Sequence, residues 1–154
     1  MSEPASGSGG DRPRRQLRRV NPAELAPATG FSHAVLGTGT VVFLAGQTAL
    51  DHTGTIVGGT IVEQFCTALS NLLTALRAAG GQPCDLASLT VYLTDIPDYR
   101  EHAREIGRVW RDLVGADYPA MAAIGVTRLW DDEALVEIAG HAVIPGGQPA
   151  GGSA

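Results

Sequence analysis

The strongest constraint on the fold is an amphipathic segment between residues 60 and 81. Thr60 and Glu63 stand three apart, the spacing of a capping box in which each side chain accepts a hydrogen bond from the other residue's backbone N–H. Apolar residues then recur every three or four positions, at Ile61, Phe65, Leu69, Leu72, Leu73 and Leu76. Gly80 and Gly81 end the pattern. The sequence therefore predicts a helix that buries one face in a core.

Segments with the composition of β-strands precede and follow this helix. Residues 31–36 and 40–50 are rich in β-branched and aromatic side chains and are separated by Gly-Thr-Gly, a pattern typical of a hairpin. Three further strands are predicted over residues 86–95, 122–129 and 135–144.

A second helix is predicted between the third and fourth strands. Asp98 and Glu101 have capping-box spacing, and Gly115 ends the segment. Its apolar face would carry Tyr99, Ala103, Ile106, Trp110 and Leu113, and its solvent face Arg104, Glu105, Arg108 and Arg111. The order is then β-β-α-β-α-β-β, which favours an α/β fold of sandwich type, with one mixed sheet and both helices on one of its faces.

The last strand indicates what the other face of the sheet carries. Its alternate residues Val136, Ile138, Ala142 and Ile144 are apolar and suit the helix side. The intervening residues, Glu137, Ala139, His141 and Val143, form a mixed surface. Such a surface is typical of a subunit interface or of a cleft between subunits.

Composition sets the limits of the domain and excludes several functions. Residues 1–22 are Gly/Ser/Pro-rich and then Arg-rich, and residues 146–154 are Gly-rich, so we expect flexible tails around a domain over residues 24–145. The chain has no lysine, which excludes Schiff-base catalysis through a lysine side chain. From residue 21 onward six arginines face fourteen acidic residues, a balance of about −8 that disfavours nucleic acid as a partner.

Other classes are disfavoured by what the sequence lacks. No run of eighteen apolar residues could form a membrane span, and no secretory signal begins the chain, so we expect a cytoplasmic protein without membrane contact. Cys66 and Cys84 have no histidine at ligand spacing, and we expect reduced thiols, no metal site and no cofactor.

Several longer motifs resemble one family. The pieces are FSHAV, LAGQTALD, the helical segment from GGTIVEQF to RAAGG, LTVYLTDIPDYREH, YPAM and LVEIAGHAVIP, which together cover about residues 26–145. In this order they resemble the Rid (YjgF) family of reactive-intermediate imine deaminases. The resemblance implies a chorismate-mutase-like (YjgF-like) fold and a homotrimer with clefts between its subunits. It also implies addition of water to an enamine or imine, which releases ammonia and a keto acid.

Carried over by position, the resemblance places most of the family's site. The glutamate that positions or activates water falls on Glu137, the glycine-glutamine pair on Gly46 and Gln47, and the tyrosine on Phe31. The substrate-binding arginine of the motif P-A-R falls on Met121. A charged hydrogen bond to a carboxylate contributes about 1.5–3 kcal/mol, and a thioether contributes none of it. We therefore expect little activity on simple 2-imino acids.

Two functional hypotheses follow. In the first, the protein is an enzyme of changed substrate scope acting on a small molecule. Its cleft would be lined by Phe31, Met121, Ala122 and Ala139, with polar groups from Gln47, Glu137, His33 and His141. In the second, a trimer binds a metabolite or assists a pathway enzyme without turnover. A third, separate role would be recruitment of an anionic partner by the Arg-rich tail.

Overall fold

Helix α1 (Ile61–Ala78) begins and ends where its sequence pattern predicts, in a computed structural model that describes residues 17–146. Thr60 Oγ1 accepts a hydrogen bond from Glu63 N (3.2 Å), and the Glu63 carboxylate accepts one from Thr60 N (3.1 Å). At the other end Gly80 adopts a φ of 88°, and the N–H groups of Gly80 and Gly81 bond to the carbonyls of Arg77 and Leu76. The predicted capping box is confirmed.

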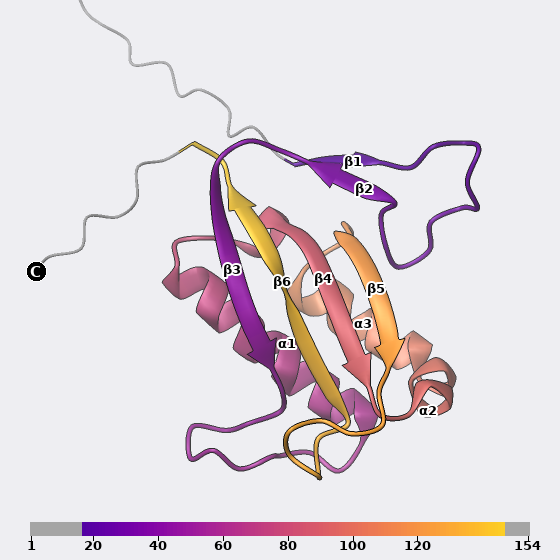
Figure 1. Cartoon of the computed structure of the whole chain (residues 1–154), viewed down its shortest axis with the longest axis vertical. Helices are drawn as coiled ribbons and strands as arrows, with labels where there is room; N and C mark the ends of the chain where they lie inside the picture. The colour runs from indigo at the N-terminus through magenta and orange to yellow at the C-terminus, as the bar shows by residue number, and fades with distance from the viewer. Residues whose placement is uncertain (1–16, 147–154) are drawn as a thin grey trace, which may run out of the picture.

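The main sheet has four strands in the order β3 (Thr40–Gln47), β6 (Val136–Ile144), β4 (Leu86–Leu93) and β5 (Ala120–Gly125). Strand β6 runs antiparallel to both neighbours, whereas β4 and β5 are parallel (Figure 1).

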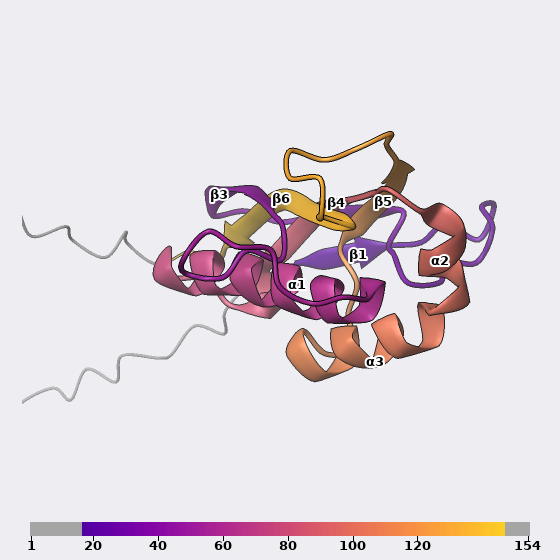
Figure 2. The same ribbon diagram turned by 90° about the horizontal axis from the view of Figure 1, so that it is seen from below.

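The helices that follow β3 and β4 cover a single face of this sheet. A 3-10 turn (Pro83–Asp85) leads from α1 into β4, and α2 (Ile96–Glu101) and α3 (Ala103–Leu113) connect β4 to β5. Seen from below, α1 and α3 lie on the same side of the sheet (Figure 2). The predicted mixed sheet with helices on one face is confirmed.

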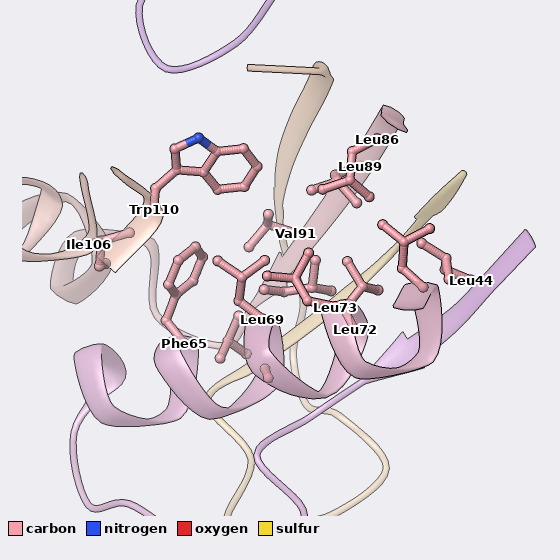
Figure 3. Close-up of a cluster of buried hydrophobic side chains, with 14 of the residues drawn as sticks. Leu44, Phe65, Leu69, Leu72, Leu73, Leu86, Leu89, Val91, Ile106 and Trp110 are labelled. Atoms are coloured by element: carbon pink, nitrogen blue, oxygen red, sulfur yellow. The ribbon is translucent and has the colours of Figure 1, made fainter. Parts of the chain in front are cut away.

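The core lies between α1 and the inward residues of the sheet. Leu69, Leu72, Leu73 and Leu76 of α1 are fully buried, and they meet apolar side chains of β4 and β6 (Figure 3). Burial of each leucine contributes about 1.5–3 kcal/mol relative to exposure. Residues Val136, Ile138 and Ala142 of β6 are buried, as their alternation predicts. The intervening residues of β6 therefore face away from the helices, onto what we call the open face of the sheet.

The hairpin predicted from residues 31–36 and 40–50 is wrong. Strand β2 (Ala34–Leu36) pairs instead with β1 (Arg18–Val20), in a separate two-stranded sheet, and β3 pairs with β6. The sequence turn at Gly37–Gly39 carries the chain from the small sheet to the large one. The longer β6, with a full row of buried residues, gives β3 a better partner than the three-residue β2.

The predicted start of the domain is also corrected. Residues 17–22 belong to the fold: Leu17 is buried and its side chain lies against Gly37, while β1 pairs along its whole length. Local composition conceals this because the partners of β1 lie elsewhere in the chain. The rest of the two tails, residues 1–16 and 147–154, falls outside the described residues.

The second helical region starts earlier than predicted and is interrupted. Asp95, not Asp98, caps α2, because Asp95 Oδ1 accepts a hydrogen bond from Asp98 N at 2.9 Å. Pro97 lies in the first turn, where proline's fixed φ favours a helix start. His102 separates α2 from α3. The strand predicted over residues 122–129 covers Ala120–Gly125 instead, and a loop follows it.

The buried Gln64 side chain generates a test of how α1 is joined to the start of β6. Its Nε2 donates to the carbonyls of Gly58 (3.0 Å) and Glu133 (2.9 Å), and its Oε1 accepts from Leu135 N (2.8 Å). Gln64→Leu keeps the size but leaves these groups unpaired, so we expect a loss of about 2 kcal/mol or more in the free energy of unfolding. Chemical denaturation measures it. The exposed Gln82→Leu serves as the control, and equal stability of the two variants would contradict the assignment.

Candidate functional site

A cavity of about 430 Å³ lies between α3, β5 and residues 29–31. We call it the α3 cavity. Its walls are mainly apolar and aromatic, and they include Phe31, Phe65, Ile106, Trp110, Tyr118 and Met121. Pockets of this size with few polar groups are typical of small-molecule sites.

Met121 points into the α3 cavity because of its register in the sheet. It is paired with Leu89 across the parallel β4–β5 ladder, so the two side chains lie on the same face of the sheet. Leu89 is buried in the core, and half-buried Met121 packs against that core. Phe31 and Ala122 line the same cavity. Three of the predicted substrate-binding residues are thus brought together on the helix side and edge of β5.

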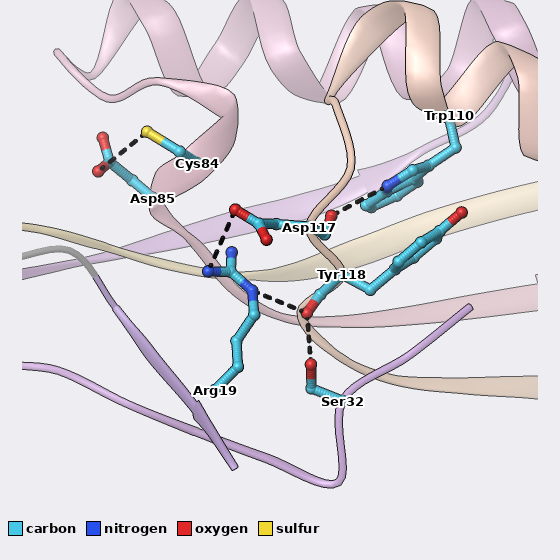
Figure 4. A network of polar contacts seen from close by, with 7 residues as sticks. All are labelled: Arg19, Ser32, Cys84, Asp85, Trp110, Asp117 and Tyr118. Atoms are coloured by element: carbon cyan, nitrogen blue, oxygen red, sulfur yellow. Dashed lines mark hydrogen bonds and ion pairs between the residues drawn. The ribbon is translucent and has the colours of Figure 1, made fainter. Parts of the chain in front are cut away.

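The entry to β5, which forms one wall, is held by contacts from α3 and from residues near the start of the described chain (Figure 4). The rings of Trp110 and Tyr118 are stacked, with centroids 5.1 Å apart, and Trp110 Nε1 donates to the Asp117 carbonyl at 3.1 Å. The Tyr118 carbonyl accepts hydrogen bonds from Arg19 Nε (3.1 Å) and Ser32 Oγ (2.7 Å). Strand β1 therefore helps to position the aromatic wall of the cavity.

The cavity also contains polar groups that sequence reasoning missed. Tyr99 lines the cavity, where burial raises the pKa of its phenol above the ordinary value and nearby Tyr118 adds to the effect. Arg111 is exposed, as predicted from its place on the solvent face of the helix, and it also lines the cavity. The sequence did contain an indication that Arg111 borders the cavity: Ala103, Gly107 and Arg111 are four residues apart, which places all three on one side of α3.

A second group of predicted residues lies on the open face of the sheet. A bulge between Leu44 and Gln47 of β3 brings Gly46 against β6, where a Cβ on residue 46 would overlap Glu137 Oε1. Glycine at this position makes room for the carboxylate. We call Gly46, Gln47 and Glu137 the Glu137 cluster, and Ala139 is the next residue of β6 on the same face.

The two histidines proposed as proton carriers each make a local hydrogen bond. His33 Nε2 lies 2.8 Å from the carbonyl of Ala26, and its ring meets the edge of Phe31 at 5.0 Å. His141 Nδ1 lies 3.1 Å from Ser88 Oγ on the open face. Because four residues of β6 span about 13 Å, His141 is remote from Glu137. His33 lines a second pocket together with Phe31, Met121 and Ala122, and neither histidine is in the Glu137 cluster.

One chain holds two separate sets of site residues. The α3 cavity lies on the helix side, at the β5 edge, and the Glu137 cluster lies on the open face between β3 and β6. Strand β4 lies between β5 and β6, so the axes of β5 and β6 are about 10 Å apart. Within residues 17–146 no three His, Cys, Asp or Glu side chains are grouped to hold a metal ion. The helices described there include none long and apolar enough to cross a membrane.

Comparison with known proteins gives a consistent result. The model of the family described as Endoribonuclease L-PSP matches residues 21–144. A RutC family protein of Pyrococcus horikoshii is 36% identical over 113 residues, covering 73% of this chain and 85% of that protein. The human 2-iminobutanoate/2-iminopropanoate deaminase is 33% identical over 116 residues, covering 73% of this chain and 81% of the deaminase.

The fold comparison agrees with the sequence comparison. The crystal structure of a protein of unknown function from Yersinia pestis, described as a member of the conserved Rid protein family, superposes with a TM-score of 0.75. The two are 34% identical, and the match covers 84% of this chain and 99% of that one.

The contact between Gly46 and Glu137 can be tested by a double-mutant cycle. Gly46→Ala forces the flexible Glu137 carboxylate aside, and we expect a loss of about 1 kcal/mol in the free energy of unfolding. The same substitution in a Glu137→Ala background should cost much less, because the overlapping atoms are gone. Urea denaturation of the four proteins measures both costs, and equal costs would show that the two residues do not meet.

Proposed function

The chain belongs to the Rid (YjgF) family, and on that premise we propose that it hydrolyses a reactive imine or enamine whose substituents are larger and more apolar than those of simple 2-imino acids. The name of the human relative supports deamination as the reaction type. The single observation that carries the change of scope is Met121, which gives the α3 cavity an apolar wall at the position of the family's substrate-binding arginine.

The Glu137 cluster supplies the chemistry in this proposal. Glu137 accepts a proton from a water molecule as the water oxygen bonds to the C=N carbon. Return of that proton to nitrogen gives a carbinolamine. Transfer of the hydroxyl proton to nitrogen, again through Glu137, then lets the C–N bond break as the C=O bond forms, so that an imine and water become a carbonyl compound and ammonia. The geometry at Gly46 supports this role, because the absent side chain leaves the carboxylate its place on the open face.

A homotrimer would bring the two sets of residues together. Apolar side chains are exposed on the open face and its edges, among them Phe43 at 79% and Ile124 at 43%, and we propose that neighbouring subunits cover them. The α3 cavity of one subunit would then face the Glu137 cluster of the next. This arrangement gives the cleft a catalytic carboxylate and a binding cavity from different chains.

Non-catalytic metabolite binding is the alternative, and one observation favours it. His33 and His141 are both held by local hydrogen bonds, and a site that keeps Glu137 as its one proposed proton carrier also suits binding without turnover. Nucleic acid remains a poor substrate for either version because acidic residues outnumber basic ones from residue 21 onward.

Met121 can be tested by restoring the family residue. Met121→Arg should raise ammonia release from enzymatically generated iminopropionate by about tenfold or more, since a charged hydrogen bond to the substrate carboxylate contributes about 1.5–3 kcal/mol. Wild type and Met121→Leu, which keeps the apolar wall, should accelerate the reaction little. A large acceleration by the wild type would overturn the proposed scope.

Glu137→Gln separates catalysis from binding. The amide keeps the size of the side chain but cannot accept a proton from water, so turnover of any imine substrate should be lost while ligand affinity stays nearly unchanged. Steady-state kinetics and calorimetry on the same preparation measure the two effects. Full activity in the variant would remove Glu137 from the mechanism.

A further inference from the structure

Among residues 17–146, Arg111 is the only charged residue that lines the α3 cavity. It follows Ala103 and Gly107 at four-residue spacing, and these three residues form a row along α3 that borders the cavity. Arg111 and Ala103 are exposed, which places this row at the mouth. The small side chains at 103 and 107 leave the entrance open, and the guanidinium lies beside it.

The guanidinium lies over Gly107, on the row of α3 that borders the cavity. A Cβ built on Gly107 would lie 3.6 Å from Arg111 Nη1, so the arginine side chain folds back along the helix over the glycine. The ion pairs found within residues 17–146 join Arg19 to Asp117 and His102 to Asp98, and none involves Arg111. Its planar set of donors is thus free, within the described chain, to bind two oxygens of a ligand.

We propose that Arg111 binds a carboxylate of the substrate, in place of the guanidinium that Met121 does not provide. The apolar part of the same molecule would fill the cavity between the Trp110–Tyr118 stack and Met121. This identification of the ligand as the substrate rests on the proposed function. The binding site itself does not, because it depends only on the cavity and its charge.

The position of Arg111 defines the class of substrate. In a 2-imino acid the carboxylate is attached to the reacting carbon, so its binding group must adjoin the reaction site. Arg111 lies on α3, across the cavity from the strand that carries Met121. It therefore suits an organic acid in which an apolar segment separates the carboxylate from the imine or enamine carbon. Tyr99, a further polar residue, also lines the cavity.

The test uses two probes of the same size and shape, the anion 3-phenylpropionate and the neutral amide 3-phenylpropionamide, with dissociation constants measured by calorimetry or NMR titration of the full chain. The wild type should bind the acid about tenfold or more tightly than the amide. Arg111→Gln should weaken binding of the acid by about the same factor and leave binding of the amide unchanged. Arg108→Gln, on the same helix and exposed but outside the cavity, is the matched control and should change neither.

Equal affinity of the wild type for acid and amide, or unchanged acid binding in Arg111→Gln, would overturn the proposal. So would failure of the acid to bind at millimolar concentration. The Glu137→Gln variant keeps this test distinct from that of the proposed function. It should bind the acid like the wild type, and acid binding that depends on Arg111 would support the site even in a protein that shows no turnover.

Discussion

Packing of α1 against β4 and β6 is the interaction on which the rest of the structure depends. The leucines of α1 are fully buried against the inward residues of these central strands. Because α1 occupies the middle of that face, α3 lies toward the β5 edge. There the side chains do not fill the space between α3 and β5, and the α3 cavity remains. The same packing selects which residues of β6 point inward, so it also directs Glu137 to the open face.

The two-residue period of the strands explains why the site is divided. Met121 is on the helix side because its partner Leu89 is there, whereas Glu137 pairs with Tyr92, which belongs to the other set of side chains on β4. No rotation of a side chain moves either residue through the sheet. Under the proposed function the reaction is therefore a property of the contact between subunits, and the exposed apolar side chains of the open face are the surfaces that make this contact.

Charge in the cavity is best understood together with its apolar walls. Met121 provides no hydrogen-bond donor on β5, where the family has an arginine, whereas Arg111 provides a guanidinium on the α3 side of the cavity. An apolar cavity with a charged group at its mouth excludes water from the body of a ligand and strengthens the interaction with its ionic end. Relocation of the guanidinium from strand to helix would thus change the length and shape of the acids that the site accepts, while keeping a carboxylate as the recognised group.

The sequence by itself determined the long helix with its capping box, the alternation of β6, the family and the position equivalent to Met121, because these depend on local spacing or on matched motifs. It could not determine the partner of β2, the start of the domain at Leu17 or the cap at Asp95. The cap was missed because Asp98 and Glu101 also have capping-box spacing, whereas Pro97 favours a helix that starts before them. Only the tertiary structure decided that Arg111 faces the cavity and that Gly46 adjoins Glu137. The physical reason is that such contacts join residues from different elements, and their geometry is set by packing and register rather than by neighbours in the chain.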